Sequence, residues 1–321
     1  MSTILITWSS GFIWFHTAKK LLEQGETIIG FDNENDYYDV NLKIARRKEL
    51  EKFPNFKFYK NNLEDLDSVK NVFEENQIDK VLNLAAQAGV RYSLINPFAY
   101  IQTNVVGFHN LIELAKQHKV KNFVYASSAS IYGGNKKIPF AVGDQTDSPI
   151  SLYWATKKTD ELIAHAYSFY FKLPTIWLRF FNVYGPRGRP DGAFFIFAKW
   201  ILEDKTIEVY NEGKTIRNFT YIDDIVDGII KTLNHVPANN YEIFNLWNTN
   251  TVVLNYMLEC IEKECWKVGK KEFLPADIAD IPESWVDIEH TKQLLWREPK
   301  TDIEEWVKNL IQRYKEFYNF K

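Results

Sequence analysis

Glycine is scarce in this sequence, and tryptophan is abundant. The chain has 14 glycines in 321 residues, about 4.4%, where about 7% is usual, and it has 10 tryptophans. Counted together, the two residue types reach about 7.5%, close to the usual level of glycine alone. The deficit of one residue type therefore matches the excess of the other.

Cysteine and dense positive charge are also in short supply. Only two cysteines, Cys260 and Cys265, are present, which excludes a disulfide framework and a cysteine metal cluster and predicts a reducing, cytoplasmic location. The six histidines are scattered, without a pair at metal-ligand spacing, so no metal site is predicted. The net charge of −3, without a dense basic stripe, argues against a nucleic-acid partner.

No stretch has the length and apolar character needed for a membrane span or an export signal. The most apolar stretch, residues 192–202, is interrupted by Lys199 and is shorter than the ~20 residues that a bilayer requires. The N-terminus has no basic region, and Thr3–Thr7 is too short for the apolar part of a signal peptide. The sequence thus predicts a soluble protein that does not associate with a membrane.

Short, β-branched apolar runs alternate with longer helical patterns in the first half of the chain. Such alternation is typical of a parallel sheet that is covered by helices on both faces. We predict an α/β fold, a Rossmann-like doubly wound parallel sheet with a smaller C-terminal substrate-binding lobe. The predicted strands are Ile4–Thr7, Thr27–Asp32, Lys57–Asn61, Lys80–Ala85, Asn122–Ser127 and Thr175–Asn182, and predicted helices include Gly107–His118, Trp154–Tyr170 and 303–317.

The pattern changes after about residue 183, where pieces become shorter and richer in Gly, Pro and Asn. We therefore predict a dinucleotide-binding domain over residues 1–182 and a smaller lobe over residues 183–321 that closes over a substrate. The segment 219–245 reads as a strand or turn followed by a helix, and we expect it to return to the first domain.

The turn after the first strand carries tryptophan where a dinucleotide loop carries glycine. The sequence is Trp8-Ser9-Ser10-Gly11-Phe12-Ile13-Trp14, which becomes G-x-x-G-x-x-G when both tryptophans are replaced by glycine. Such loops need glycine for a tight turn, for close approach to a pyrophosphate and for helix–strand contact. An indole obstructs all three, so NAD binding by the printed sequence is expected to be poor.

One hypothesis accounts for both the loop and the composition. The ten tryptophans are UGA codons that the source organism reads as glycine, since bacterial genetic codes differ in assigning UGA to glycine or to tryptophan. Trp154, Trp247 and Trp296 also stand at small-residue or turn-like positions. The alternative is that Trp8 and Trp14 are literal, in which case the chain is a non-catalytic binding or scaffold protein.

Asp32 ends the second predicted strand, 21 positions after Gly11. An acid about 20 residues beyond a dinucleotide loop can accept hydrogen bonds from both hydroxyls of the adenosine ribose. The same carboxylate would repel the 2′-phosphate of NADP. The predicted cofactor is therefore NAD, although an Asp at a strand end is often only a turn residue.

Tyr153 and Lys157 are four residues apart at the start of a predicted helix, so they share one helix face. A neighbouring ammonium stabilises a phenolate and brings its pKa closer to the working pH for proton transfer. The pair follows a predicted fifth strand that ends in hydroxyl residues, Ser127-Ser128-Ala129-Ser130. A lone Y-x-x-x-K is weak evidence, but its combination with the strand order and this hydroxyl cluster is a more specific signal of a proton-transfer site.

With these motifs in place, the chain resembles the extended short-chain dehydrogenase/reductase superfamily over essentially its whole length. Within it, the chain is most similar to the NAD-dependent sugar-nucleotide epimerases, and above all to the UDP-glucuronate 4-epimerases. The runs that carry the resemblance are 32–40 (DNENDYYDV), 84–93 (LAAQAGVRYS), 179–186 (RFFNVYGP) and 219–225 (FTYIDDI).

The resemblance implies a role for each matching residue. Tyr153 would take the proton of the sugar 4-hydroxyl while hydride passes from C4 to NAD, and Lys157 would hold the nicotinamide ribose. Ser128 would bridge the phenol and the 4-oxygen, supported by Ser127 and Ser130. The resulting 4-keto intermediate would then rotate in the pocket and take the hydride back on its other face. The implied cofactor-binding residues are Gly11, Phe12, Ile13, Asp32, Asn33, Asn62, Leu63, Leu84, Ala85, Ala86, Asn104, Tyr153 and Lys157.

The implied substrate is a UDP-sugar, with Arg217 clamping the diphosphate and Arg189 near the glucuronate carboxylate. For Arg189, an ordinary surface arginine in a turn is an equally weighted alternative. The implied substrate-binding residues are Ser127, Ser128, Ser130, Asn182, Arg189, Arg217 and Asp280. The family also implies a homodimer, built through residues 97–118 and 154–170, and a place in polysaccharide biosynthesis.

Several positions depart from the family pattern. Asn62 stands where the family usually has an Asp that contacts adenine, and Asn182 stands where glucuronate epimerases often carry Thr. Asn218 replaces the usual Asp after Arg217, and Asp277 adds a negative charge near the diphosphate. These departures leave UDP-glucose or a UDP-N-acetylhexosamine open as substrate. A 4,6-dehydratase is disfavoured, because Ala129-Ser130 occupies the place of the Asp-Glu pair that those enzymes carry. A UDP-glucuronate decarboxylase is also disfavoured, because this chain lacks the acid that such enzymes carry near the hydroxyl.

Overall fold

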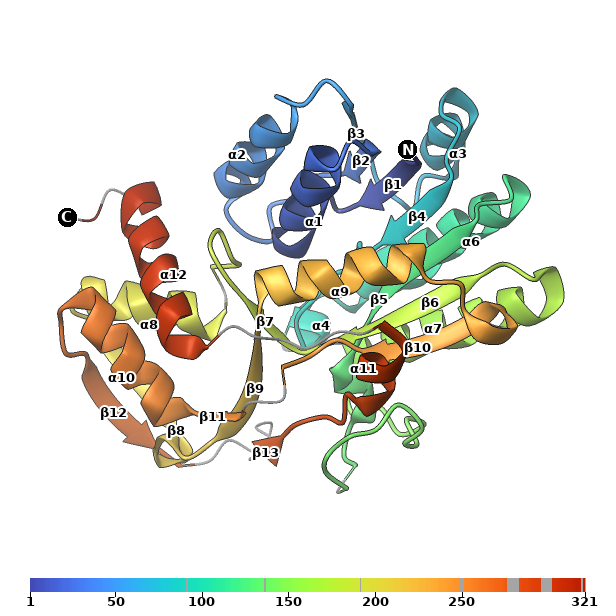
Figure 1. The fold of residues 1–321 in the computed structure, drawn as a ribbon. Coiled ribbons are helices and arrows are strands. Elements are labelled where there is room, and N and C mark those ends of the chain that lie inside the picture. The colour runs from blue at the N-terminus through green and yellow to red at the C-terminus, as the bar shows by residue number, and fades with distance from the viewer. Residues whose placement is uncertain are drawn as a thin grey trace.

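A computed structural model describes residues 1–90, 92–135, 137–190, 192–248, 251–275, 283–295, 302–318 and 320. Its centre is a seven-stranded, fully parallel sheet with the strand order β10-β6-β5-β4-β1-β2-β3 (Figure 1). The strands are β1 (Thr3–Thr7), β2 (Thr27–Asp32), β3 (Phe56–Lys60), β4 (Lys80–Asn83), β5 (Asn122–Ser128), β6 (Thr175–Phe180) and β10 (Tyr241–Asn245). The predicted doubly wound α/β fold is confirmed.

Helices cover both faces of this sheet, and each face has its own apolar core. On one face lie α1 (Phe12–Glu23), α2 (Val40–Leu50), α9 (Ile222–Asn234) and α11 (Glu289–Leu295). On the other lie α3 (Leu66–Glu75), α6 (Phe108–Gln117) and α7 (Leu152–Phe171). The central strands are buried on both sides, which explains why their sequences are continuously apolar and do not alternate.

Short helical segments connect some of these elements. Helices α4 (Tyr92–Ile95) and α5 (Pro97–Tyr100) lead into a π-helix over Ile101–Gly107, which runs directly into α6. A 3₁₀ turn, Ala129–Tyr132, follows β5, and two more cover Asn211–Gly213 and Ala238–Asn240. A π-helical turn is rare and often accompanies a functional site.

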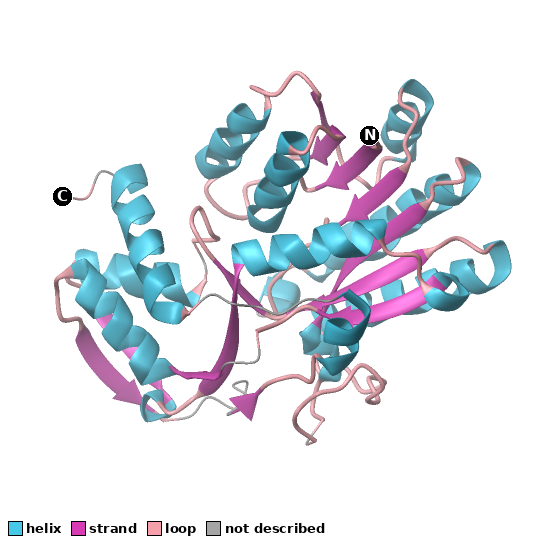
Figure 2. Ribbon diagram, viewed as in Figure 1, coloured by secondary structure: helices cyan, strands magenta, loops and turns pink. Residues whose placement is uncertain are grey.

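In its described residues, the second lobe contains two small sheets and the helices α8 (Ala193–Leu202), α10 (Leu254–Cys265) and α12 (Ile303–Tyr318) (Figure 2). One sheet has the order β11-β9-β13 with β7 paired to β9, and the other pairs β12 with β8. The strands are β7 (Asn182–Tyr184), β8 (Thr206–Tyr210), β9 (Ile216–Tyr221), β11 (Thr251–Val253), β12 (Lys270–Leu274) and β13 (Glu283–Ser284). Helices α8, α10 and α12 share the core of this lobe.

The chain changes sheets where the sequence predicts one long strand. The prediction Thr175–Asn182 is divided in the structure into β6, which pairs with β5 and β10, and β7, which pairs with β9 of the other lobe. Phe181 alone separates them. Both strands are partly or fully buried, and the polar Asn182 at the start of β7 is the one local mark of the change.

Candidate functional site

Four neighbouring pockets follow the carboxyl ends of the parallel strands and continue into the second lobe; together we call them the trough. Trp8 and Ala86 line both the first and the second pocket. Phe12, Phe181 and Val183 line both the second and the third, and Asn182 lines the third and the fourth. In parallel α/β sheets, ligands bind at this edge of the sheet.

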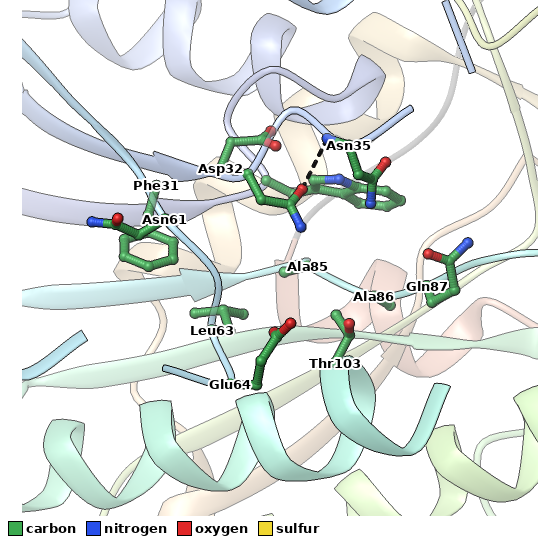
Figure 3. A pocket seen from close by; sticks show the side chains of 12 residues that line it. Phe31, Asp32, Asn35, Asn61, Leu63, Glu64, Ala85, Ala86, Gln87 and Thr103 are labelled. Atoms are coloured by element: carbon green, nitrogen blue, oxygen red, sulfur yellow. Dashed lines mark hydrogen bonds between the residues drawn. The ribbon is translucent and has the colours of Figure 1, made fainter. Parts of the chain in front are cut away.

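The first pocket contains the acid at the end of β2. Asp32 is buried, and its two carboxylate oxygens accept the backbone N–H groups of Ser10 (2.9 Å) and Glu34 (2.7 Å). Burial raises the pKa of Asp32, although these hydrogen bonds oppose the rise. Figure 3 shows Asp32 across the pocket from Leu63, with Ala85 and Ala86 also on the wall. Asn33 lines the same pocket.

Glu34 is a second buried acid beside Asp32, which the sequence analysis did not single out. Its carboxylate accepts Arg47 Nε (2.8 Å) and lies 3.4 Å from Lys60 Nζ. Glu34 follows Asp32 by two residues in a polar run, and that adjacency was the available signal. Glu34 does not line the first pocket, and its two cationic partners offset its charge, so the preference against a 2′-phosphate rests on Asp32.

Two predicted cofactor-binding residues, Asn62 and Asn104, form hydrogen bonds with other residues of the protein. Asn62 does not line the first pocket, but its side-chain oxygen accepts Asn33 Nδ2 (2.8 Å). Asn104 is buried in the π-helix, where it accepts the backbone N–H of Gln87 (2.7 Å) and donates to Thr156 Oγ1 (3.0 Å). Asn104 therefore links the loop after β4 to the start of α7.

The second pocket brings the proposed reaction groups together. Tyr153, Lys157, Ser127 and Ser128 all line it, as does Arg189 from the second lobe. The pocket is also lined by the predicted cofactor residues Gly11, Phe12, Ile13, Leu84 and Ala86. Helix α7 begins just before Tyr153 because the Ser151 hydroxyl caps it, accepting the backbone N–H of Trp154 (3.2 Å).

The ammonium of Lys157 is held by a residue that the sequence analysis did not identify. Asp160 Oδ2 accepts Lys157 Nζ at 3.0 Å, and both side chains are almost fully buried. Burial raises the pKa of Asp160 to about 7, while the charge of Lys157 lowers it. The signal was an acid three residues after the lysine, one helical turn away.

A buried ion pair between Glu161 and Arg179 fixes the position of Ser127 near the end of β5. The Ser127 hydroxyl donates to Glu161, whose carboxylate also accepts Arg179 Nε (3.2 Å) and Nη2 (3.1 Å). Burial lowers the pKa of Arg179, but the negative charge of Glu161 outweighs this effect and helps to raise the pKa above its ordinary value. Ser127 is thereby fixed on the pocket wall next to Ser128.

The predicted substrate residues lie in the part of the trough formed by the second lobe. Arg189 and Asn182 line the third pocket, and Asn182 and Arg217 line the fourth. Asn182 Nδ2 donates to the carbonyl of Asn218 (3.2 Å), which joins β7 to β9. Asp280, Asp277 and Trp296 lie outside the described residues, as does the side chain of Ser130.

Helix α2 connects two loops beside the trough through a buried arginine that the sequence did not reveal. Arg46 Nη1 donates to the carbonyl of Ser10 (3.0 Å) and to the hydroxyl of Tyr38 (2.9 Å). Its Nη2 donates to the carbonyls of Arg187 and Gly188. Arg46 thus joins the turn after β1 to the segment that leads to Arg189.

Comparison with known proteins agrees with this geometry. The model of the NAD dependent epimerase/dehydratase family matches residues 4–246. Protein CapI of Staphylococcus aureus is 43% identical, covering 98% of this chain and 99% of that protein. A UDP-glucuronate 4-epimerase of Thermodesulfobacterium geofontis is 42% identical, covering 98% and 97%. The structure of the Bacillus cereus UDP-glucuronic acid 4-epimerase in complex with UDP-glucuronic acid and NAD superimposes with a TM-score of 0.91 at 30% identity, covering 98% of this chain and 100% of that one.

Proposed function

Because the chain belongs to the NAD-dependent epimerase/dehydratase family and is a UDP-sugar 4-epimerase of that family, we propose that it interconverts UDP-glucuronate and UDP-galacturonate. The cofactor is NAD, as in the family. The observation that carries the substrate proposal is the position of Arg189, a cation from the second lobe in the same pocket as Tyr153 and Lys157.

The residues of the first pocket fit the adenosine half of NAD. The Asp32 carboxylate is already oriented by two backbone hydrogen bonds, and a carboxylate has lone pairs left to accept ribose hydroxyls. Leu63 and Ala85 offer apolar surface for a base. NAD held there would supply a reversible hydride acceptor for C4 of the sugar.

The protein's own groups handle the proton. The Tyr153 phenolate takes the proton of the 4-hydroxyl as C4 is oxidised, and returns it when the ketone is reduced on its other face. The Lys157 ammonium, held by Asp160 at 3.0 Å, supplies positive charge one helical turn from Tyr153. Ser128 lines the same pocket at the end of β5, where its hydroxyl can bridge the phenol and the sugar oxygen.

The second lobe holds the rest of the substrate. Arg217 lines the fourth pocket, where a guanidinium can bind diphosphate oxygens with paired hydrogen bonds. Arg189 lies between that pocket and the reaction groups and is placed to bind a sugar carboxylate. The guanidinium carbon of Arg189 lies over the ring of Tyr37, 5.9 Å from the ring centre, and this contact helps to orient the Arg189 side chain.

Turnover of three UDP-sugars tests the substrate. UDP-glucuronate, UDP-glucose and UDP-N-acetylglucosamine are incubated separately with the purified chain, both as printed and with glycine at all ten tryptophan positions, and products are separated by chromatography. We expect the second of these, the glycine form, to produce UDP-galacturonate from UDP-glucuronate and the printed chain to show little turnover. Arg189→Ala in the glycine form should lose this activity chiefly through KM. If a form that binds NAD converts UDP-glucose alone, the proposal is overturned and the chain is a UDP-glucose 4-epimerase. Asn182, which stands where glucuronate epimerases often carry Thr, is the residue that favours this alternative.

We also propose that the enzyme is a cytoplasmic homodimer. Helices α4, α5 and α7 contact one another and expose several large apolar side chains, among them Leu94, Phe98 and Leu162, which are 78%, 80% and 60% exposed. These helices fall within or beside the residues 97–118 and 154–170 expected for the dimer contact. The free, buried thiols of Cys260 and Cys265 support a reducing compartment. Among the described helices, none has the length and apolar character to cross a membrane.

A further inference from the structure

The backbone at Trp8 has a conformation that favours glycine. Its φ of 60° lies in the left-handed region, where a side chain with a Cβ meets its own backbone. The turn is tightly fixed, because the N–H of Trp8 donates to the carbonyl of Phe31 (2.6 Å) and its carbonyl accepts the N–H of Gly11 (2.8 Å). Bulky residues are uncommon in this conformation, whereas glycine adopts it without strain.

The side chain of Trp8 stands in the path that a dinucleotide takes. It lines both the pocket that contains Asp32 and the pocket that contains Tyr153. A dinucleotide with its ribose at Asp32 and its nicotinamide near Tyr153 must cross between them, with its pyrophosphate against the turn after β1. An indole occupies that crossing, and glycine would leave it open.

Trp14 crowds the same turn from the helix side. Its indole lies so close to Gly11 that a Cβ built on that glycine would be 2.7 Å from Trp14 Cδ1. Trp14 also lines the second pocket, although it is buried in the core at the start of α1. The third glycine of a dinucleotide loop allows close helix–strand packing, and Trp14 occupies that position.

A tryptophan far from the trough has the same backbone signature. Trp266 follows the last residue of α10 in the left-handed conformation, with a φ of 58°, and 90% of it is exposed. Helices commonly end with glycine in this conformation. An exposed indole there gains no burial to offset the backbone cost.

Three further tryptophans are buried without satisfying their indole N–H groups. Trp154, Trp177 and Trp306 are almost fully buried, and their Nε1 atoms have no hydrogen-bond partner in the described part of the protein. Buried indoles usually find a partner, because a lost hydrogen bond is costly. Trp306 also lies with its ring centre only 3.6 Å from that of Tyr184, closer than the usual 4.5–7 Å.

Trp247 differs from these, because its indole donates to the carbonyl of Arg179 (2.6 Å) and stacks on Phe181. A tryptophan can therefore be accommodated in this fold. Trp8 and Trp14 differ from Trp247, because Trp8 combines a left-handed backbone with a place in the pockets and Trp14 packs closely against Gly11.

We propose that the natural protein carries glycine at positions 8 and 14, from UGA codons read as glycine, and that only this form has a complete pyrophosphate site for NAD. The same cause places glycine at the other UGA-encoded positions, including Trp266 and Trp306. The proposal rests on NAD being the cofactor of the family and is independent of which UDP-sugar is the substrate.

Mass spectrometry of the protein from its own organism tests the residue identities directly. The first tryptic cleavage site is after Lys19, so one peptide, residues 1–19, contains both positions. We expect the mass of this peptide to correspond to glycine at both, and the gene to contain UGA at both codons. A peptide with two tryptophans, or UGG at these codons, would overturn the proposal whatever the substrate proves to be.

NAD binding to expressed variants tests the consequence. We expect Trp8→Gly/Trp14→Gly to bind NAD at least about tenfold more tightly than the printed sequence, measured by calorimetry. Trp200→Gly is the matched control: Trp200 packs in the core of the second lobe and lines none of the four pockets, so this change should leave NAD affinity as it is. Equal NAD affinity of the printed sequence and the double variant would contradict the proposal. Failure of a tight NAD-binding form to convert UDP-glucuronate would contradict only the substrate.

Discussion

At the scale of single residues, the chemistry depends on the phenol of Tyr153. Its ring packs edge-on against Tyr100, at 6.1 Å between centres, so removal of the hydroxyl leaves the packing intact. We expect Tyr153→Phe to lower kcat by about 10²–10⁴-fold, the usual contribution of a positioned acid–base group. Steady-state kinetics of the glycine form with UDP-glucuronate measures this, and an unchanged Tm would show that the fold is preserved. A loss below tenfold would mean that another group moves the proton.

Asp160 gives a second residue-scale prediction, on pH. Its pKa is raised in the folded protein, from 3.8 to about 7, mainly by burial. The folded state therefore binds this proton more tightly than the unfolded state, and the stability gained below pH 4 is lost as the pH rises to 7. Asp160→Asn does not titrate, so it should gain roughly 2–4 kcal/mol relative to the wild type between pH 4 and pH 8.

Urea unfolding of both proteins at several pH values measures this difference. A stability difference that stays constant between pH 4 and pH 8 would contradict the prediction. Asp147→Asn is the matched control, because Asp147 is exposed and pairs with Lys158 at the surface.

At the scale of elements, α2 fixes two loops through Arg46. Loss of the guanidinium leaves the carbonyls of Ser10, Arg187 and Gly188 without this donor, at a cost of about 2–4 kcal/mol. Because Arg46 lines none of the four pockets and acts through these two loops, we expect Arg46→Ala in the glycine form to raise KM for UDP-glucuronate more than it lowers kcat. Lys48→Ala, an exposed position on the same helix, should change neither.

The comparison of KM and kcat for these two variants distinguishes loop positioning from general destabilisation. An Arg46→Ala variant with lower Tm but unchanged KM would assign Arg46 a role in stability only.

Helix α1 is joined to the second lobe through His16. The Nε2–H of His16 donates to the carbonyl of Pro186 (2.9 Å), and burial, followed by the charges of Arg46 and Arg187, lowers its pKa to about 4. A depressed pKa means that stability is fully present above about pH 6.5 and is lost as the pH falls towards 4. We expect a loss of roughly 2–3 kcal/mol over that range, and a smaller loss in His16→Gln, by thermal unfolding.

The sequence predicts the elements of the large sheet well and the second lobe poorly. Strands β2 and β5 are buried on both faces, so their apolar runs have nearly the predicted bounds. The small sheets are formed by short strands such as β7 and β13, whose pairing depends on partners distant in the sequence. Local patterns carry no information about that pairing.

The candidate site shows the same division at residue level. Tyr153 and Lys157 could be predicted because their spacing places them on one helix face. Arg46 and Glu34 could not, because a charged residue on a helix or in a polar run is usually exposed. Only the folded chain shows that these two are buried against the turn after β1.

At the scale of the whole molecule, the exposed apolar side chains of α4, α5 and α7 predict assembly. Phe98→Asp/Leu162→Asp should convert the proposed dimer to a monomer in sedimentation velocity experiments, because buried charges without partners oppose association. Val268→Asp, an equally exposed apolar position in the second lobe, should leave the dimer intact. A printed chain that sediments as a monomer at micromolar concentration would rule out this interface.

The position of β10 at the edge of the large sheet has a consequence for the growing chain on the ribosome. Strand β6 pairs with β10, yet about 60 residues separate the end of one from the start of the other. At 5–20 residues per second, synthesis of that stretch takes roughly 3–12 s. During this time the last strand of the unfinished sheet has an open hydrogen-bonding edge, which is where nascent chains pair wrongly with one another. The protein is therefore most vulnerable to aggregation in the seconds when its second lobe is being translated.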